Sequence, residues 1–491
     1  MKKILFLVVI AFVFLWMMPS GCAVIVPPTG GPKDSLPPVF MGATPKDSTL
    51  NFKEKLITLN FNEYINLDNV FTNLIVSPTP KHTPTIIGHL RQVTIRIKDT
   101  LEPNTTYSYN FGKSIKDVNE GNMLRNFTYV FSTGGHIDTS TISGTVKLAQ
   151  TGGVDSTILV VLYTDFSDTA VYKTQPKYYT TLDSAGKFAF HFLPKAKFKL
   201  FAVANSYMKN YADSTTQFAF LDSTLNTGSD SLAQNQNLRL YAFQAYQKEE
   251  KKTSTANLSD KQKEKRKEQD AKKALTITNN LEQGKQSLLT PFKFTYSKPL
   301  KSFDSTQILL TDTNNVKISN YMVYHDSTDT TNTRFILKTA WLEDSSYRLI
   351  IPTGAAKDSF DIALKKADTV SFQAKNNHDY ATIELNFPDV DTILNPVLQI
   401  LTSDNKLLDS IRITASRKVT LPMYEPGKYN FRILYDKNGD MKWTPGNYKK
   451  RLQPEIVVGI RSTFEFIADT ENQWDIHLKA PDEPKYNPLK L

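Results

Sequence analysis

Short segments in which apolar and polar residues alternate constrain the fold of this chain more than any other feature. They recur from Val39 onwards, and clear examples are Leu56–Phe61, Val93–Ile97, Tyr107–Phe111 and Phe127–Phe131. Each segment has a period of two and is bounded by Asn, Asp, Pro or Gly, which is typical of strands with one buried face. Aromatic residues make up 11% of the chain and also favour sheets. The sequence therefore predicts an all-β protein built from β-sandwiches.

An internal repeat divides the chain into two related halves. The stretches 59–65, 101–107 and 112–117 have counterparts at 294–300, 342–347 and 354–358. A second pair of similar stretches follows in the same order, at 186–201 and 421–432. A repeat this long indicates duplicated domains rather than a solenoid. With 491 residues the chain has room for about three or four domains.

The segment 246–273 lies between the halves and breaks the β pattern. It holds ten Lys and Arg residues against six Asp and Glu, with almost no large apolar residue. Ser259 and Gln262 have the spacing of a helix capping box. The composition predicts a solvated helix or a flexible linker. Contact with anionic lipid or polysaccharide is the alternative, which the interspersed acidic residues disfavour.

The N-terminus has the pattern of a secretory signal peptide. Lys2 and Lys3 precede the apolar run Ile4–Met18, which is shorter than the ~20 residues that a spanning helix needs. Ser20 and Gly21 then lead to Cys22, the one cysteine of the chain. This ending resembles a bacterial lipoprotein signal, which implies that Cys22 is acylated and becomes the mature N-terminus. The alternatives are an ordinary signal peptide or an uncleaved anchor with an incidental cysteine.

The first part of each half resembles the bacterial Ig-like domain first named from S-layer proteins. That family has a Leu-x-Pro-x-Thr-x-Tyr stretch before one strand, which Leu101–Tyr107 matches with a shift of one residue. It also has a Lys-Asp-x-x-Gly-Asn turn before the last strand, which Lys116–Asn122 resembles. The second copy keeps Leu342, Tyr347, Lys357 and Asp358 but lacks the Gly-Asn pair. The resemblance implies a β-sandwich in both halves.

The second part of each half resembles prealbumin-like sandwiches of the carboxypeptidase-regulatory type. The residues that match are Asp183, Gly186 and Phe188 in the first copy, and Pro426, Gly427 and Tyr429 in the second. Gly427 suits a turn position with positive φ. Together with the Pro- and Gly-rich stretch after Cys22, the whole chain resembles an Ig-domain envelope lipoprotein family of diderm bacteria. That resemblance implies a fold and a location, but no biochemical activity.

These observations predict the following order of segments along the chain. They are a lipoprotein signal peptide at 1–21, a Pro/Gly tether at 22–38, a bacterial Ig-like domain at 39–134, a prealbumin-like sandwich at 138–245, the charged linker at 246–273, a divergent Ig-like domain at 274–375, a second prealbumin-like sandwich at 376–480, and a tail at 481–491.

Composition and motifs argue against several classes of function. The net charge of +10 is mild for this length and the basic residues are mostly scattered, so nucleic-acid binding is not indicated. A single cysteine excludes intrachain disulfides and cysteine-based zinc sites. The seven histidines form no His-Glu-x-x-His motif, and the chain has neither a Gly-x-Ser-x-Gly elbow nor a Gly-rich phosphate loop. We therefore expect a protein that is not an enzyme and has no cofactor.

One loop carries a metal hypothesis. Asp436, Asn438 and Asp440 place oxygen-bearing side chains at alternate positions, as at the start of an EF-hand calcium loop. Met441 and Asn447 stand where that loop would have Gly and a bidentate Glu. The alternative is a tight hairpin turn at Asn438–Gly439, between strands at Phe431–Tyr435 and Lys442–Trp443. The sequence favours the hairpin over calcium.

The tripeptide Asp-Ser-Thr occurs six times, at 47–49, 155–157, 213–215, 222–224, 304–306 and 326–328. Asp and Ser cap turns by accepting from the backbone two residues on, so we interpret the repeats as turns with Thr beginning the next strand.

The sequence thus predicts a lipid-anchored, non-catalytic structural or adhesive binding module of the cell envelope. An envelope enzyme, an accessory subunit of one, or a component of surface-polymer assembly or transport are the alternatives. The expected partners are the membrane, through Cys22, and an envelope protein or glycan. The expected location is the outer membrane, facing the periplasm, because Ala23–Val26 lacks the acidic residues that often direct lipoproteins outwards.

Overall fold

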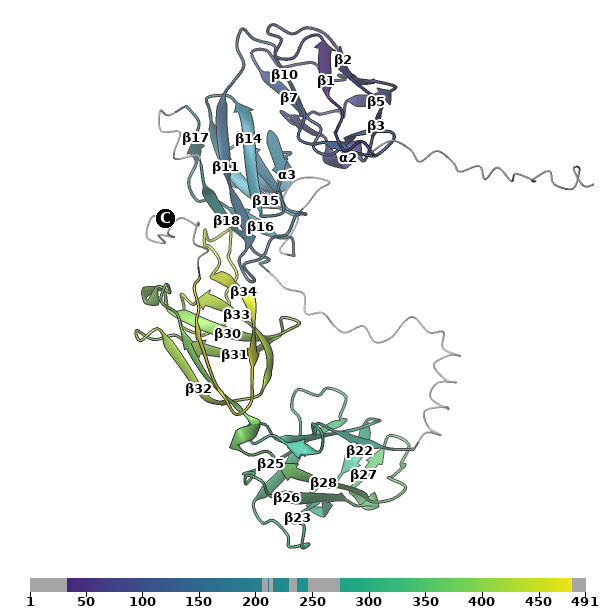
Figure 1. Ribbon diagram of the computed structural model, residues 1–491, viewed down its shortest axis with the longest axis vertical. Coiled ribbons are helices and arrows are strands. Elements are labelled where there is room, and N and C mark those ends of the chain that lie inside the picture. Colours follow the sequence, from purple (N-terminus) through teal and green to yellow (C-terminus); the bar gives the residue numbers. More distant parts are fainter. Residues whose placement is uncertain (1–32, 205–210, 212–214, 229–235, 246–273, 479–491) are drawn as a thin grey trace, which may run out of the picture. The chain divides into compact units, whose positions relative to one another are not determined.

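The computed structural model describes residues 33–204, 211, 215–228, 236–245 and 274–478. The predicted signal peptide, most of the tether, the charged linker and the tail lie outside these residues. Nearly all regular elements are strands (Figure 1), which confirms the all-β prediction. The helices are short, namely α2 (Val70–Asn73), α3 (Ala170–Lys173) and the 3-10 turns η2 (Ser305–Gln307), η3 (Thr353–Ala355), η4 (Asn377–Asp379) and η5 (Thr392–Leu394). No helix in this described part is long and apolar enough to cross a membrane.

The described chain forms two compact units, one up to Ser140 and one with nearly all residues from Thr141 on. We call the four β regions A1 (39–134), B1 (138–245), A2 (274–375) and B2 (376–478).

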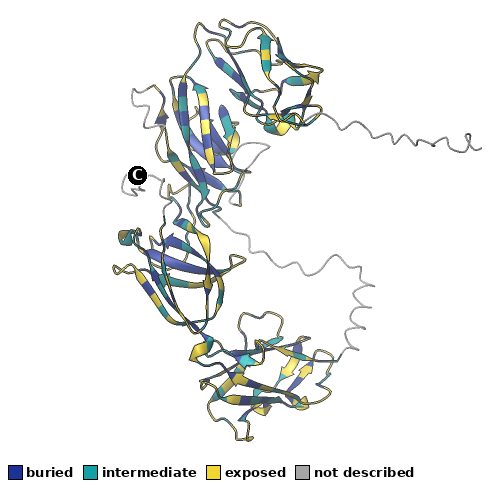
Figure 2. Cartoon of the chain, in the orientation of Figure 1, coloured by how far each residue is buried: buried dark blue, intermediate teal, exposed yellow. Residues whose placement is uncertain are grey.

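A1 is a sandwich of short antiparallel strands. One sheet has the order β1 (Phe40–Thr44), β2 (Leu56–Phe61), β6 (Gln92–Arg96), β5 (Thr85–His89). The second has the order β10 (Thr128–Ser132), β7 (Thr106–Asn110), β4 (Ile75–Ser77), and a small sheet has the order β3 (Ile65–Leu67), β8 (Ile115–Asp117), β9 (Met123–Leu124). The predicted alternation is confirmed, since Ile57, Leu59 and Phe61 on β2 are buried between less buried neighbours. Figure 2 shows buried and exposed residues alternating along many of the strands.

A2 repeats this topology. Its sheets have the orders β19 (Ile277–Asn279), β21 (Phe292–Tyr296), β25 (Arg334–Thr339), β24 (Tyr321–His325), then β20 (Lys285–Gln286), β28 (Asp368–Ala374), β26 (Ser346–Ile351), β23 (Leu309–Asp312), and β22 (Leu300–Phe303), β27 (Ala356–Asp358). The tyrosine paired by the sequence repeat makes the same bond in both copies. Tyr107 accepts from the backbone N–H of Glu102 at 2.8 Å, and Tyr347 accepts from that of Leu342 at 3.0 Å.

B1 and B2 also share one strand order. B1 has the sheets β14 (Lys187–Leu193), β11 (Ser140–Leu148), β18 (Leu238–Ala242) and β13 (Tyr178–Thr181), β12 (Leu159–Tyr163), β15 (Lys197–Val203), β16 (Phe218–Phe220), with β17 (Leu225–Asn226) beside β15. B2 has β32 (Lys418–Tyr424), β29 (Ala381–Asn386), β35 (Glu471–Asp475) and β31 (Leu407–Arg412), β30 (Pro396–Thr402), β33 (Gly427–Tyr435), β34 (Ile456–Phe466). In each, the first and last strands pair in parallel.

Three of the Asp-Ser-Thr repeats, at 155–157, 304–306 and 326–328, are turns whose threonine does not begin a strand. Asp155, Asp304 and Asp326 each accept from both the backbone N–H and the hydroxyl of the threonine two residues later. The nearest following strands begin two or more residues beyond each threonine. The threonine therefore closes the turn, because its hydroxyl completes the ring that the aspartate starts.

Candidate functional site

The loop that contains Asp436, Asn438 and Asp440 is much longer than the predicted hairpin. β33 ends at Tyr435, and its antiparallel partner β34 begins only at Ile456. Residues 442–443 form no strand, so the hairpin prediction is wrong. The reason is that residues 443–453 pack against B1, a sandwich far away in the sequence, as described below. We call residues 436–455 the docking loop.

Asp436 is fully buried at the start of the docking loop, where its carboxylate organises the backbone. Oδ1 accepts from the N–H of Gly439 at 2.8 Å, and Oδ2 accepts from the N–H of Met441 at 3.0 Å. Oδ2 also accepts from Nη2 of Arg412 on β31 at 3.2 Å. These hydrogen bonds and the ion pair offset the free-energy cost of burying the charged carboxylate.

Asn438 and Asp440 lie beside Asp436 in the sequence and are exposed. Asn438 Oδ1 accepts from the N–H of Asp440 at 3.1 Å, while its Nδ2 donates to Asp440 Oδ2 at 3.2 Å and to Thr444 Oγ1 at 2.9 Å. Asp440 Oδ1 accepts from the N–H of Lys442 at 2.7 Å. The three predicted residues are thus in one loop, and their oxygens are engaged by the donors of that same loop.

A calcium ion at Asp436 would have to compete with the guanidinium of Arg412. In the described residues, no group of three or more His, Cys, Asp or Glu side chains is placed to hold a metal ion. Calcium takes six to eight oxygens, and the Arg412 guanidinium at Asp436 occupies one of the positions with a positive charge. Calcium binding at Asp436, Asn438 and Asp440 stays a prediction.

Glu455 is the residue that the sequence reasoning missed. It is buried at the other end of the docking loop, where Oε1 accepts from the N–H of Lys437 at 2.8 Å and Oε2 from the N–H of Thr444 at 2.9 Å. Its backbone carbonyl accepts from Nε1 of Trp443 at 2.9 Å. The one signal in the sequence is an acidic residue directly before an apolar strand. Glu455 and Asp436 together fix both ends of the loop.

The middle of the docking loop enters the hydrophobic core of B1. Tyr448 is buried there, with its ring centroid 5.7 Å from Phe201, 5.3 Å from Phe218 and 5.1 Å from Phe220. A Cβ built on Gly446 would lie 2.7 Å from the ring of Phe243, so a glycine is required for this approach. Aromatic pairs at such distances contribute beyond the burial of their area.

A polar rim surrounds this aromatic contact. Arg451 forms an ion pair with Asp168, which also accepts from Lys199 Nζ at 3.1 Å. The hydrogen bond from Lys199, reinforced by the charge of Arg451, lowers the pKa of Asp168. Gln453 Nε2 donates to the carbonyl of Phe220 at 3.1 Å and to Asp222 at 3.0 Å. The docking loop thus joins B2 to B1 by an aromatic centre with a charged edge.

A backbone contact continues the same junction. The N–H of Val457, at the start of β34, donates to the carbonyl of Ala149 at 2.9 Å. A Cβ on Gly152, which has a φ of +71°, would lie 2.8 Å from both the Val457 carbonyl and the Gly459 nitrogen. The backbone at Gly152 therefore packs directly against the backbone of Val457 and Gly459, which leaves no room for a side chain at Gly152.

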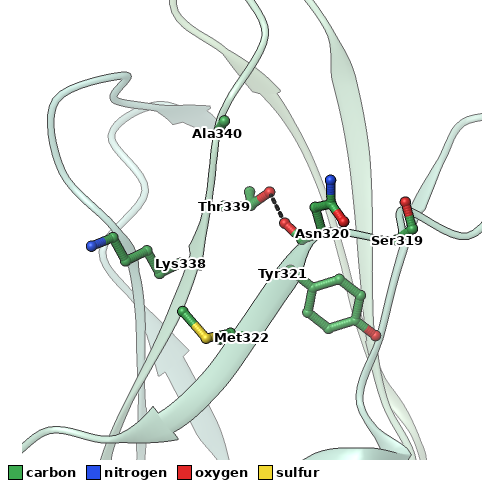
Figure 3. Close-up of a pocket in the computed structure, with 7 residues that line it drawn as sticks. All are labelled: Ser319, Asn320, Tyr321, Met322, Lys338, Thr339 and Ala340. Atoms are coloured by element: carbon green, nitrogen blue, oxygen red, sulfur yellow. Dashed lines mark hydrogen bonds between the residues drawn. The ribbon is translucent and has the colours of Figure 1, made fainter.

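A shallow cavity of about 610 Å³ lies elsewhere, on A2 at the start of β24 and the end of β25 (Figure 3). Ser319, Asn320, Tyr321, Met322, Lys338, Thr339 and Ala340 line it. Within this lining, Thr339 Oγ1 donates to the Asn320 carbonyl at 2.7 Å. Cys22, the predicted lipid-attachment residue, lies outside the described residues.

Comparison with known families identifies one part of the chain. Residues 34–133 match the family described as a bacterial Ig-like domain, which agrees with the resemblance of A1. No match was found among the curated proteins.

Solved structures with likeness to this chain include several bacterial surface proteins. The Bacillus anthracis TIE protein is 12% identical, with 91% of this chain and 75% of that chain covered and a TM-score of 0.15. The major pilin subunit BcpA of Bacillus cereus is 9% identical, with 69% and 99% covered and a TM-score of 0.18. The BSP domain of a biofilm-associated protein is 10% identical, with 84% and 97% covered and a TM-score of 0.16. At these scores none of the three carries a functional argument.

Proposed function

We propose that this protein is a lipid-anchored, non-catalytic structural and adhesive module of a bacterial cell envelope. The observation that carries the proposal is the docking loop, which joins two sandwiches that are remote in the sequence through a buried aromatic centre. A chain that fixes its domains to one another in this way suits a scaffold that holds a binding surface in place. The match of residues 34–133 to a bacterial Ig-like family supports the same assignment.

The buried acids support a role without catalysis. Asp117 accepts from the backbone N–H groups of Glu120, Gly121 and Asn122, and the equivalent Asp358 accepts from those of Phe360 and Ile362. These hydrogen bonds stabilise the charged form and lower the pKa of both groups, against the opposing effect of burial. Carboxylates held in this way stabilise turns rather than transfer protons.

The anchor belongs to the proposal as well. Cys22 would carry the lipid, and the tether at 22–38 would separate the membrane from A1. We place the protein on the periplasmic side of the outer membrane, since Ala23–Val26 carries no acidic residue.

Fractionation of cells that express the Cys22→Ser variant tests the anchor. Wild-type protein should sediment with outer membranes, whereas the variant should be released or remain unprocessed, because a single acylated cysteine is the proposed attachment. Ser20→Ala is the matched control and should sediment like wild type. A Cys22→Ser protein that matures and sediments normally would refute the lipid anchor.

Protease treatment of intact cells then reports the orientation, and resistance of the wild-type protein supports the periplasmic side.

A further inference from the structure

β24 is an edge strand of A2 that lacks the usual protection against further pairing. It lies at the end of the order β19-β21-β25-β24, and its sequence Tyr321–His325 contains no Pro, Lys, Arg, Asp or Glu. It pairs with β25 over five residues without a register shift. By contrast, the edge strand β31 has a bulge and β32 contains Pro422. Edges are normally blocked by such features, so an open edge of this kind is a template for another strand.

The hydrogen bonds of the hairpin show which backbone groups face outwards. The N–H of Asp326, directly after β24, donates to the carbonyl of Arg334 on the β25 side at 3.0 Å. Backbone groups alternate along a strand, so Tyr324 and Met322 also face β25. The N–H and carbonyl groups of Tyr321, Val323 and His325 therefore point away from the sheet. No strand in the described residues pairs with them.

The outer face of this edge combines apolar and positively charged side chains. Met322 is 63% exposed and Tyr324 is 43% exposed, both on the same face. Lys338 lies opposite Met322, and Lys293 lies on the far side of Ile336, which is opposite Tyr324. Neither lysine forms an ion pair with an acidic side chain of the described chain. Figure 3 shows Met322 and Lys338 pointing to one side of the hairpin and Tyr321 to the other.

The cavity of about 610 Å³ adjoins the start of this edge. Lys338 and Met322 belong to both the cavity wall and the outer face, so a strand laid along β24 would end over the cavity. Adjacent strands lie about 4.8 Å apart, which brings the long Lys338 side chain within reach of an added strand across Met322. The unpaired edge of β24, the charge of Lys338 and the cavity therefore lie on the same surface of A2.

We propose that the β24 edge of A2 binds an extended, acidic segment of a partner protein as an additional strand. The outward groups of Tyr321, Val323 and His325 supply the main-chain hydrogen bonds, and alternate acidic side chains of the segment meet Lys338. A protein segment is favoured over a glycan because the edge offers donors and acceptors at the spacing of another backbone. This inference rests on the proposed adhesive function and gives it a partner class.

Fluorescence anisotropy with a labelled peptide tests the proposal. The probe is the labelled and amidated peptide Glu-Thr-Glu-Thr-Glu-Thr, whose acidic side chains share one face of an extended strand, with Lys-Thr-Lys-Thr-Lys-Thr as its charge-reversed counterpart, added to the full chain carrying Cys22→Ser. The acidic peptide should bind at least fivefold more tightly than the basic one. Lys338→Glu should reverse that preference, and Lys357→Glu, on the separate strand β27, should leave it unchanged. Equal affinity for the two peptides, or no binding of either at millimolar concentration, would overturn the proposal.

Val323→Pro tests the strand pairing itself, because it removes one outward N–H from an edge strand, where proline is tolerated. Binding should fall at least fivefold while the melting temperature and circular dichroism stay close to those of wild type. In the protein that retains Val323, hydrogen exchange of residues 319–326, measured by mass spectrometry, should slow when the acidic peptide binds. Unchanged exchange there, or self-association of the chain that Val323→Pro abolishes, would instead overturn the partner assignment. None of these outcomes depends on the fractionation of Cys22→Ser, so the two proposals fail separately.

Discussion

At the residue scale, two buried carboxylates determine the conformation of the docking loop. Asp436 and Glu455 are buried at its two ends, and both accept from backbone N–H groups within residues 437–444. Removing one partner of such a buried set leaves the others without compensation. These residues therefore hold the first half of the docking loop against both of its ends.

Calcium should leave the stability of the protein unchanged. Arg412 already pairs with Asp436, and Asn447 stands where a calcium loop has its bidentate Glu, so we expect no shift of the wild-type melting temperature in millimolar calcium chloride. Asp436→Ala should destabilise by about 2–4 kcal/mol with or without calcium, since Arg412 loses its buried partner. Scanning calorimetry gives both numbers. A rise of the wild-type melting temperature that Asp436→Ala with Asp440→Ala abolishes would establish the calcium site instead.

Gly439 should be sensitive for backbone reasons alone. Its φ is +83°, and a Cβ there would meet no atom within 4 Å. Gly439→Val should cost on the order of 1–2 kcal/mol because a β-branched residue avoids positive φ, whereas Gly439→Asn should cost less. Chemical denaturation of both variants measures the difference. Equal stability of the two variants would show that the turn relaxes.

Asp379, in the turn between A2 and B2, should make stability depend on pH. The hydrogen bond from Lys285 Nζ, at 2.7 Å, is the main reason that the pKa of Asp379 is lowered, and the N–H of Asn376 adds to it. A lowered folded-state pKa gives stability that is present above the unfolded value of about 3.9 and is lost as pH falls. Asp379→Asn should therefore lower the melting temperature at pH 6, and the gap to wild type should close towards pH 3. A gap that stays constant between these values would contradict the assignment.

At the element scale, the strands of A1 could be predicted closely and the docking loop could not. The alternation at Leu56–Phe61 follows from one buried face, and β2 has those bounds. The hairpin prediction at Asn438–Gly439 used local turn chemistry, which is correct for Gly439. It failed beyond Met441 because the partners of Tyr448 lie more than 200 residues earlier, and no local pattern encodes them.

Gly446 provides the element-scale prediction. Its restriction is steric, since an added Cβ would lie 2.7 Å from Phe243 and 2.9 Å from the Leu452 carbonyl. Gly446→Val should therefore lift the docking loop from B1 and speed cleavage after Lys449, Lys450 and Arg451 by trypsin. Lys437→Ala, at the start of the loop, is a control that leaves the contact with Phe243 intact. Cleavage of Gly446→Val at the wild-type rate would mean that the loop accommodates the side chain.

At the scale of the whole molecule, the two halves share their strand orders but differ in their contacts. B1 and B2 share a strand order, but the β33–β34 connection of B2 has become a docking loop that fills the core of B1. The sequence repeat predicts the shared order. The repeat does not predict the docking, because it shows which strands the two copies share and not which residues of one copy contact the other. A2 and residues 246–273 lie between the two docked sandwiches in the chain.

The association of two cleaved halves tests this account most directly. A site for a specific protease is inserted within 246–273 of the full chain, and the cleaved protein is examined by size-exclusion chromatography and native mass spectrometry. The two halves should remain together, because B1 and B2 are joined by the docking loop and not by the segment that was cut. Tyr448→Ala, which removes the buried ring, should weaken the association by about 3 kcal/mol, or roughly a hundredfold, and separate the halves. Complete separation of the cleaved wild-type halves at micromolar concentration would contradict the docking of B2 on B1.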